Sequence, residues 1–219
     1  MDESLLQQLA QLARKGDMAD AYDLARKIAT REPENFQAWM WMAYVAQNED
    51  DKRAALHRGL ALRPGDVSVR NNLLRLLSAR HIQKAAQRGV FMSYARADEL
   101  FTVELTDGLR ASGIDAWMDM NEISVDSTWY SSVARALTDS GLMLLVLSPE
   151  ALGSAELQSE RSWFLETGKI IVPLLHKTCD YTRLNLLSPI IDFRDDFALG
   201  LHQLLRLLNG EEEAGQAAQ

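Results

Sequence analysis

Several features that would define a protein class are scarce or missing in this sequence. It contains a single cysteine, Cys179, among 219 residues, which excludes a disulfide within one chain and favours a reducing compartment. No apolar run approaches the roughly 20 residues that span a bilayer, and the acidic opening MDES is not typical of a signal peptide. We therefore expect a cytoplasmic protein that makes no use of a membrane.

Common nucleotide and metal motifs are missing too. The chain has no GxGxxG and no GxxxxGK[ST], which argues against a dinucleotide-fold dehydrogenase and a P-loop NTPase. The acidic residues of a response-regulator receiver are not in place, because the predicted first strand ends in Ser93 and the third in Ser148-Pro149. The histidines are scattered without ligand spacing, so we expect no metal site.

Charge is distributed unevenly along the chain. Residues 1–88 carry 14 basic and 11 acidic side chains, whereas residues 89–219 carry 9 basic and 20 acidic side chains. The net charge of the whole chain is −8. The acidic second part argues against nucleic acid as a partner, because phosphate binding needs a basic surface. The asymmetry is compatible with docking between the two parts, within or between molecules, and equally with simple solubility.

Residues 1–86 follow helical periodicity throughout. Helices are predicted from Leu5 and over 18–31, 35–47 and 52–62, with a fifth running from Asp66 toward Arg80. Prolines separate the pairs, as in a helical repeat. The pattern resembles the tetratricopeptide repeat, and 31 residues separate the two prolines at the junctions between helix pairs. The residues that match the repeat are Gly16, Ala21, Pro33, Trp39, Ala55 and Pro64.

From Gly89 onward, short apolar segments alternate with helical ones. This alternation predicts a five-stranded parallel sheet covered by helices on both faces, a flavodoxin-like α/β fold, preceded by the all-α repeat domain. Ligands of such sheets bind at the carboxyl ends of the strands. The strands are expected at 90–94, 115–119, 142–147, 170–175 and 190–193, and the helices at 97–111, 129–138, 154–167 and 197–208.

The segments of this second part, in order, resemble the Toll/interleukin-1 receptor (TIR) domain over residues 88–210. VFMSYARADELF is similar to the first sequence box, AWMDMNEISVDSTW to the second box and its loop, and LMLLVLSPEAL to the central strand. QSERSWFLETGKIIVPLL and SPIIDFRDDFALGLHQLL are similar to the later strands and helices. Residues 211–219 are expected to form a disordered acidic tail.

The resemblance implies an NAD+ glycohydrolase that cleaves the nicotinamide–ribose bond, with NAD+ as substrate and no cofactor. Glu160 lies at the family's catalytic glutamate. Ser93 and Arg96 match positions that approach the nucleotide, Asp119 and Glu122 match an acidic pattern that holds ribose hydroxyls, and Trp129 matches an aromatic that stacks on a substrate ring. Each of these residues also has an ordinary structural role as the alternative: surface charge, loop capping or core packing.

The chain departs from the family pattern at two places. Glu156 stands where many enzymatic members have a tryptophan, and the loop Ser124–Thr128 lacks the usual proline and glycine. The altered loop favours completion of the site by TIR–TIR self-association, extending to filaments. The resemblance thus implies a bacterial immune effector for antiviral defence that depletes NAD+ on assembly, with linear or cyclic ADP-ribose as product; the alternative is a non-enzymatic TIR adaptor in signalling.

The helical part contributes a candidate partner site. Aromatic and methionine side chains crowd the segment Trp39–Tyr44. Core packing between repeats accounts for such a cluster, and a groove for a protein or peptide partner is the alternative.

Overall fold

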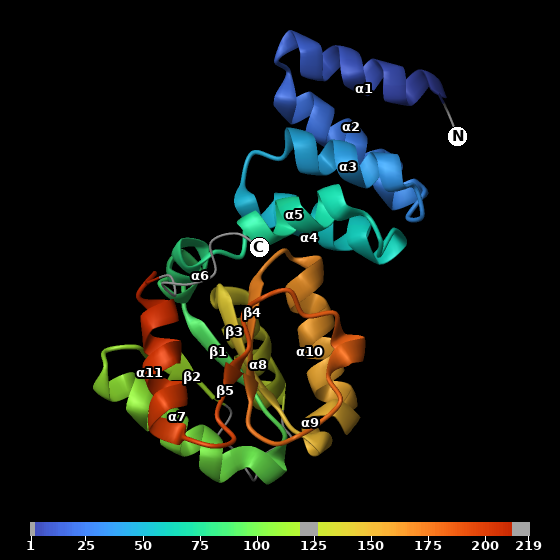
Figure 1. Ribbon diagram of the computed structural model, residues 1–219. Coiled ribbons are helices and arrows are strands. Elements are labelled where there is room, and N and C mark those ends of the chain that lie inside the picture. The colour runs from blue at the N-terminus through green and yellow to red at the C-terminus, as the bar shows by residue number, and fades with distance from the viewer. Residues whose placement is uncertain (1–2, 119–126, 212–219) are drawn as a thin grey trace. The chain divides into compact units, whose positions relative to one another are not determined.

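The computed structural model describes residues 3–118 and 127–211 (Figure 1); side chains are not described for residues 3–4 and 127–132. Contacts between Cα atoms divide the chain into two compact units, the first made of residues 1–76 with 165–169 and the second of residues 77–164 with 170–219. The units are considered one at a time.

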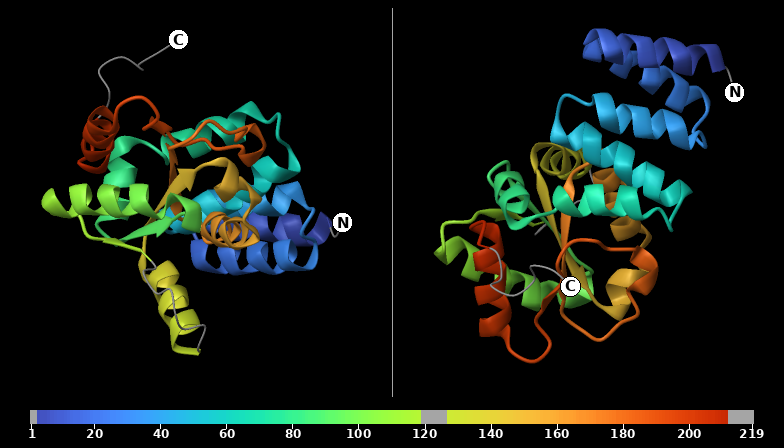
Figure 2. Two further views of the ribbon diagram at one scale, coloured as in Figure 1. Left: turned by 90° about the horizontal axis from the view of Figure 1, so that it is seen from below. Right: turned by 45° about the horizontal axis from the view of Figure 1, so that its top comes forward.

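The first unit is helical. Its successive helices pack against one another along the chain, which is consistent with a helical repeat (Figure 2). Alanines at the contacts, such as the fully buried Ala21, Ala25 and Ala38, allow the helices to approach closely. The helices are α1 (Glu3–Lys15), α2 (Met18–Arg31), α3 (Phe36–Val45), α4 (Glu49–Leu62) and α5 (Val67–Arg75).

Side-chain caps set the starts of three of these helices. Asn35, Asn48 and Asp66 each accept a hydrogen bond from the backbone N–H three residues later. The cap of α4 is Asn48, so this helix begins three residues before the predicted range of 52–62. The expected single helix from Asp66 toward Arg80 is interrupted, because residues 76–78 leave the helix before α6 (Ala79–Ala86) begins.

The second unit is built on a five-stranded parallel sheet with the strand order β2-β1-β3-β4-β5. This confirms the predicted flavodoxin-like fold. The central strand β3 (Leu142–Leu147) is buried at all six positions, as expected of a strand covered on both faces. The remaining strands are β1 (Val90–Ser93), β2 (Ala116–Trp117), β4 (Ile170–Leu175) and β5 (Ile191–Asp192). The edge strands β2 and β5 are shorter than predicted, and each pairs with a neighbouring strand on one side alone.

Helices cover both faces of the sheet. α7 (Glu99–Ala111) and α11 (Phe197–Leu208) lie together on one face, and α10 (Ala155–Glu166) lies on the other (Figures 1 and 2). α7 ends at Ala111, and its C-cap Ser112 is followed by Gly113 at φ +80°, a left-handed position that glycine adopts without strain. The unit also contains α8 (Ser127–Asp139) and α9 (Pro149–Gly153).

The helix α6 belongs to the second unit, which begins ten residues before the boundary expected at residue 86. Its apolar face packs against α11 and β3, with Ile82 fully buried and Ala79 and Ala85 nearly so. The Gln83 side chain donates a hydrogen bond to the carbonyl of Asn209 just after α11. A helix attached by sequence to the repeat thus contributes to the core of the α/β unit.

Candidate functional site

The carboxyl ends of the central strands meet at one edge of the sheet. The parallel register pairs Ser93 at the end of β1 with Leu145 of β3, and Leu147 at the end of β3 with Leu175 at the end of β4. The segments that follow these strands, including a short 3-10 helix η1 (Arg96–Asp98), are therefore neighbours in space. This is the edge at which parallel α/β sheets bind their ligands.

Two of the predicted site residues are in direct contact at this edge. The hydroxyl of Ser93 donates a hydrogen bond to Oε2 of Glu160, with an oxygen–oxygen distance of 2.7 Å. Ser93 is buried, whereas Glu160 is half-buried on α10. Such a bond stabilises the charged form of the carboxylate and fixes its orientation.

The periodicities of β1 and α10 explain this contact. Phe91 and Ser93 are two apart on a strand and point to the same face, and Glu160 and Phe164 are four apart on a helix and share a side. Phe91 packs against the ring of Phe164 with 6.2 Å between centroids, so the next pair along, Ser93 and Glu160, meets as well. An apolar contact in the core thereby positions the polar contact at its edge.

The face of α10 that packs toward the sheet is unusual in carrying charges. Leu157 and Phe164 are buried, and Glu160 and Arg161 lie between them at the three- and four-residue spacing of one helical face. Charged groups on a packing face cost desolvation energy, and they are therefore candidates for function. Glu156, which stands in the family's tryptophan position, is exposed.

The other predicted binding residues are not brought into this contact. Arg96 is exposed in η1, and its guanidinium forms no hydrogen bond or ion pair with the described residues. Asp119 and Glu122 lie outside the described residues. Trp129 lies in the first turn of α8, and its side chain is outside the described part.

A buried polar cluster, centred on Asp98, lies where the segments after β1, β3 and β4 converge. The Asp98 carboxylate is inaccessible to solvent and accepts hydrogen bonds from the hydroxyl of Ser148 and, at 2.6 Å, from Nζ of Lys177. Ser148 also caps α9, because its Oγ accepts from the Ala151 N–H at 3.0 Å. We call Asp98, Ser148, His176 and Lys177 the Asp98 cluster.

The Asp98 cluster shifts the pKa values of its basic members in opposite directions. Lys177 has a raised pKa, chiefly because its ammonium donates to the Asp98 carboxylate. His176 has a lowered pKa because burial disfavours its charged form, an effect that the carboxylate of Asp98 partly offsets. The His176 ring stacks on Phe101 of α7 with centroids 4.0 Å apart, which accounts for that burial.

Sequence reasoning missed this cluster. No motif singled out Asp98, whose side chain points inward to Ser148 and Lys177. A signal was available in the sequence, because polar residues lie shortly after three predicted central strands: Asp98 after the first, Ser148 after the third, and His176-Lys177 after the fourth.

Cysteine and metal chemistry receive no support from the described residues. Burial raises the pKa of the Cys179 thiol, which lowers the thiolate population needed for nucleophilic attack. Across residues 3–118 and 127–211 there is no group of three His, Cys, Asp or Glu side chains with the geometry to hold a metal ion.

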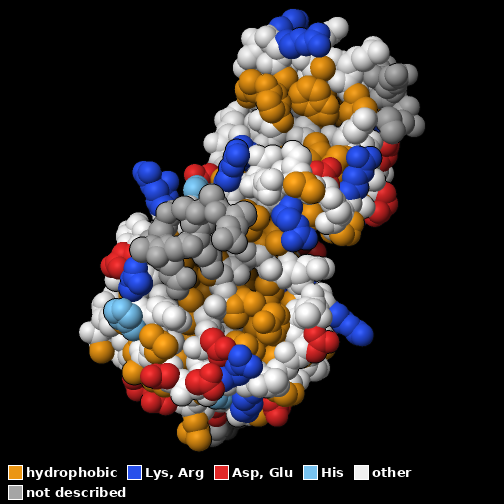
Figure 3. All heavy atoms as spheres, in the orientation of Figure 1, with side chains coloured by type: hydrophobic (Ala, Val, Ile, Leu, Met, Phe, Trp, Pro, Cys, Tyr) orange, Lys and Arg blue, Asp and Glu red, His pale blue; other side chains and the backbone are white. Residues whose placement is uncertain are grey.

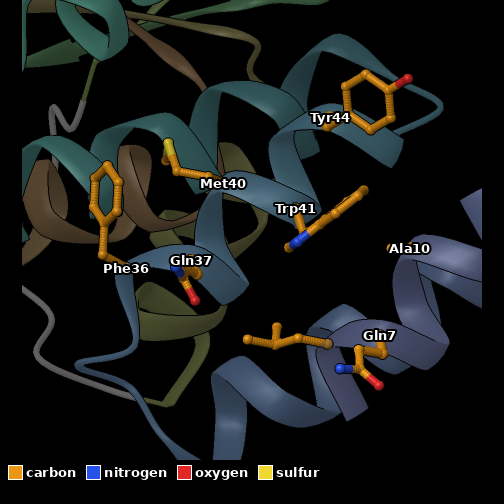
Figure 4. Close-up of a pocket in the computed structure, with 8 residues that line it drawn as sticks. Gln7, Ala10, Phe36, Gln37, Met40, Trp41 and Tyr44 are labelled. Carbon is orange, nitrogen blue, oxygen red and sulfur yellow. The ribbon is translucent and has the colours of Figure 1, made fainter. Parts of the chain in front are cut away.

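The first unit has a groove between α1 and α3 (Figure 4). It has a volume of about 840 Å³ and is lined largely by apolar side chains, with Gln7 of α1 and Gln37 of α3 among them. Figure 3 shows apolar side chains gathered over these helices. The lining residues are Leu6, Gln7, Ala10, Phe36, Gln37, Met40, Trp41 and Tyr44.

The residues of the cluster Trp39–Tyr44 lie in different environments. Met42 and Ala43 are buried in the core, and Trp39 fastens the preceding turn by donating from Nε1 to the carbonyl of Pro33 at 2.8 Å. Met40, Trp41 and Tyr44 line the groove, and the Tyr44 side chain is 69% exposed. Core packing thus accounts for some members of the cluster, and others line a groove, whose use by a protein or peptide partner remains a prediction.

The sheet order, the covering helices and the polar edge together define a flavodoxin-like α/β domain with a candidate site at the ends of its strands. A family model described as the TIR domain matches residues 90–205, more than half of the chain. The chain therefore belongs to the TIR-domain family, as its sequence boxes predict. A search of curated proteins finds no match. None of the described helices combines the length and the apolar character required to cross a membrane.

Proposed function

We propose that this protein cleaves the bond between nicotinamide and ribose in NAD+, with Glu160 as the catalytic carboxylate. The TIR family includes NAD glycohydrolases and also non-enzymatic adaptors, so membership alone does not decide between them. The observation that favours the enzyme is the placement of Glu160: a half-buried carboxylate at the ligand-binding edge of the sheet, oriented by the hydroxyl of Ser93.

The chemistry of the substrate calls for one carboxylate rather than an acid–base pair. Nicotinamide is a cationic pyridinium in NAD+ and departs as a neutral base with the electron pair of the broken C1′–N bond, so it needs no general acid. Positive charge then develops on the ribose as an oxocarbenium ion, and a fixed carboxylate beside it stabilises that charge. Water adds to C1′ and releases a proton, which gives ADP-ribose; attack by the adenine ring would give the cyclic product instead.

Self-association belongs to the same proposal. TIR domains interact with one another, and the altered loop Ser124–Thr128 motivates a site that a neighbouring copy completes. The groove between α1 and α3 offers a separate surface for a protein or peptide that controls assembly. We place the reaction in the cytoplasm, where NAD+ is abundant and a single cysteine stays reduced. The biological outcome would be depletion of NAD+ in an immune response.

The decisive experiment follows free nicotinamide released from NAD+ by the purified protein at high concentration, with Glu160→Gln as the test variant. This change removes the charge and keeps the shape and one hydrogen-bond acceptor for Ser93. We expect release to fall by about 100- to 1000-fold, the usual loss for one electrostatic group in a transition state. The thermal unfolding midpoint should change little.

Glu156→Gln is the matched control, because it makes the same change one turn earlier on α10 at an exposed position. It should retain activity. A Glu160→Gln protein within tenfold of the parent rules out Glu160 as the catalytic carboxylate. A parent that releases no nicotinamide at any concentration, yet binds other TIR domains, supports the adaptor alternative.

A further inference from the structure

The sheet-facing side of α10 holds a second charged residue, Arg161, directly after Glu160. Its Nη1 donates a long hydrogen bond of 3.3 Å to the carbonyl of Leu184, in a 3-10 helix η2 (Thr182–Leu184) that follows β4. Its Nε is buried and has no hydrogen-bond partner. Among the described residues, no carboxylate forms an ion pair with this guanidinium.

Burying part of the Arg161 guanidinium costs free energy unless a bound group supplies the missing hydrogen bonds. A guanidinium taken partly out of water loses hydration that one neutral carbonyl does not replace. Burial lowers the pKa of Arg161, and no neighbouring carboxylate acts to raise it. The edge of the planar group formed by Nε and Nη2 makes no hydrogen bond to the described residues, and this is the edge that pairs with two oxygens of one anion.

We propose that Arg161 binds the diphosphate of the nucleotide substrate, an inference that rests on the proposed function of Glu160. In NAD+ the diphosphate is attached at C5′ of the same ribose whose C1′ carries nicotinamide. A carboxylate for the ribose and a cation for the diphosphate therefore have to be close neighbours. Glu160 and Arg161 are consecutive on the face of α10 that carries Leu157 and Phe164, and Arg161 contacts η2 in the segment that follows β4, so the two side chains can reach one bound nucleotide.

A purely structural role for Arg161 predicts a different effect of its loss. If its purpose were to fasten η2 through Leu184, its loss would lower stability and leave the affinity for phosphate-bearing ligands unchanged. If it binds the diphosphate, its loss would weaken every ligand that carries the diphosphate and spare those without it. Attraction to an anion also weakens with salt, since screening acts over about 10 Å at 0.1 M.

The test is calorimetric titration of the full chain with ADP-ribose and with adenosine, at two salt concentrations. Arg161→Met should weaken ADP-ribose binding by at least about tenfold, the usual effect of losing a charge-assisted hydrogen bond. Arg161→Lys keeps the positive charge but loses the two parallel N–H donors of the guanidinium. Its affinity for ADP-ribose should lie between those of the parent and of Arg161→Met. Glu160→Gln should still bind ADP-ribose. The matched control is Arg110→Met, an exposed arginine paired with Asp107, which should bind like the parent.

Several results would overturn the inference. They are ADP-ribose binding by Arg161→Met at the parent's affinity, an equal loss for adenosine, and no binding of ADP-ribose by the parent. If Arg96→Met abolishes binding while Arg161→Met does not, the diphosphate lies at the exposed arginine of η1 instead. A parent that binds ADP-ribose through Arg161 but releases no nicotinamide retains this site and loses the proposed function, so the two failures are distinguishable.

Discussion

At the scale of single residues, one hydroxyl orients the proposed catalytic group. Ser93 is buried and donates to Glu160 at 2.7 Å, so it fixes the orientation of the carboxylate. Sequence resemblance singled out both residues separately. Their contact depends on the packing of Phe91 against Phe164 one step deeper in the core, which no local pattern reveals.

Ser93 is accordingly predicted to be a positioning residue. Ser93→Ala should lower kcat for nicotinamide release by about tenfold, because a hydrogen bond to a charged group contributes roughly 1.5–3 kcal/mol. KM should change much less, since the bond orients the carboxylate and does not bind substrate directly. Steady-state kinetics separates the two parameters.

The control for this prediction is Ser159→Ala, which removes an exposed hydroxyl on α10 that bonds only its own helix, at the carbonyl of Ala155. It should leave both parameters unchanged. A large rise in KM with unchanged kcat in Ser93→Ala would show that Ser93 binds substrate rather than Glu160.

At the scale of elements, the Asp98 cluster joins three segments that are distant in sequence. Asp98 follows β1, Ser148 follows β3, and Lys177 follows β4, so one carboxylate ties together the exits of three neighbouring strands. The backbone N–H groups of His176 and Lys177 both donate to the carbonyl of Leu147 and reinforce this connection. The proposed site thereby has a rigid base next to η1.

Asp98→Asn is predicted to destabilise the α/β unit. The amide cannot accept from Ser148 and Lys177 as a carboxylate does, and a buried group whose partners are lost typically costs about 1–3 kcal/mol. Chemical denaturation should show a lower midpoint at an unchanged slope.

Asp115→Asn is the comparison for this variant. The Asp115 side chain is 91% exposed, and its carboxylate lies 4.0 Å from the Arg110 guanidinium, which makes a long ion pair. Its midpoint should match the parent, as exposed pairs contribute little. An Asp98→Asn protein as stable as the parent would mean that the Asp98 cluster does not hold the strand exits together.

At the scale of the whole molecule, the packing of α6 sets the boundary between the helical unit and the α/β unit. Periodicity assigned residues 1–86 to one helical domain, because α6 follows the other helices and has a clear apolar face. The face of α6 packs on α11 and β3, so the α/β unit begins at Leu77. Periodicity identifies a helix and its buried side but does not identify the surface that it packs against.

Two shortened chains test this division. A chain that begins at Leu77 should fold with its sheet intact, whereas one that begins at Gln87 should unfold at a temperature lower by at least about 5 °C. The difference arises because burial of an isoleucine such as Ile82 alone contributes about 1.5–3 kcal/mol. Circular dichroism during heating gives both midpoints.

The same shortened chain from Leu77 tests the role of the helical unit. We expect it to retain nicotinamide release when concentrated and to lose the assembly of the full chain, as light scattering on both proteins would show. Equal assembly and equal activity in the two proteins would assign the helices, with the groove between α1 and α3, to a separate partner instead.

The sequence by itself determined the class of this protein. Alternating apolar segments dictate a parallel α/β sheet, helical spacing dictates the N-terminal helices, and the ordered boxes identify the TIR family. These signals are local, since each depends on residues within one element or on elements in chain order. They also singled out Ser93 and Glu160 as candidate site residues, which remains a prediction.

Only the tertiary structure decided which of those residues meet. The bond between Ser93 and Glu160, the bond between Asp98 and Lys177, the contact of Arg161 with Leu184 and the packing of α6 on the sheet all join distant segments. Side-chain periodicity fixes the face of an element but not its partner. The partner is chosen when many apolar surfaces are buried together, and the energy of that burial is shared over the whole core.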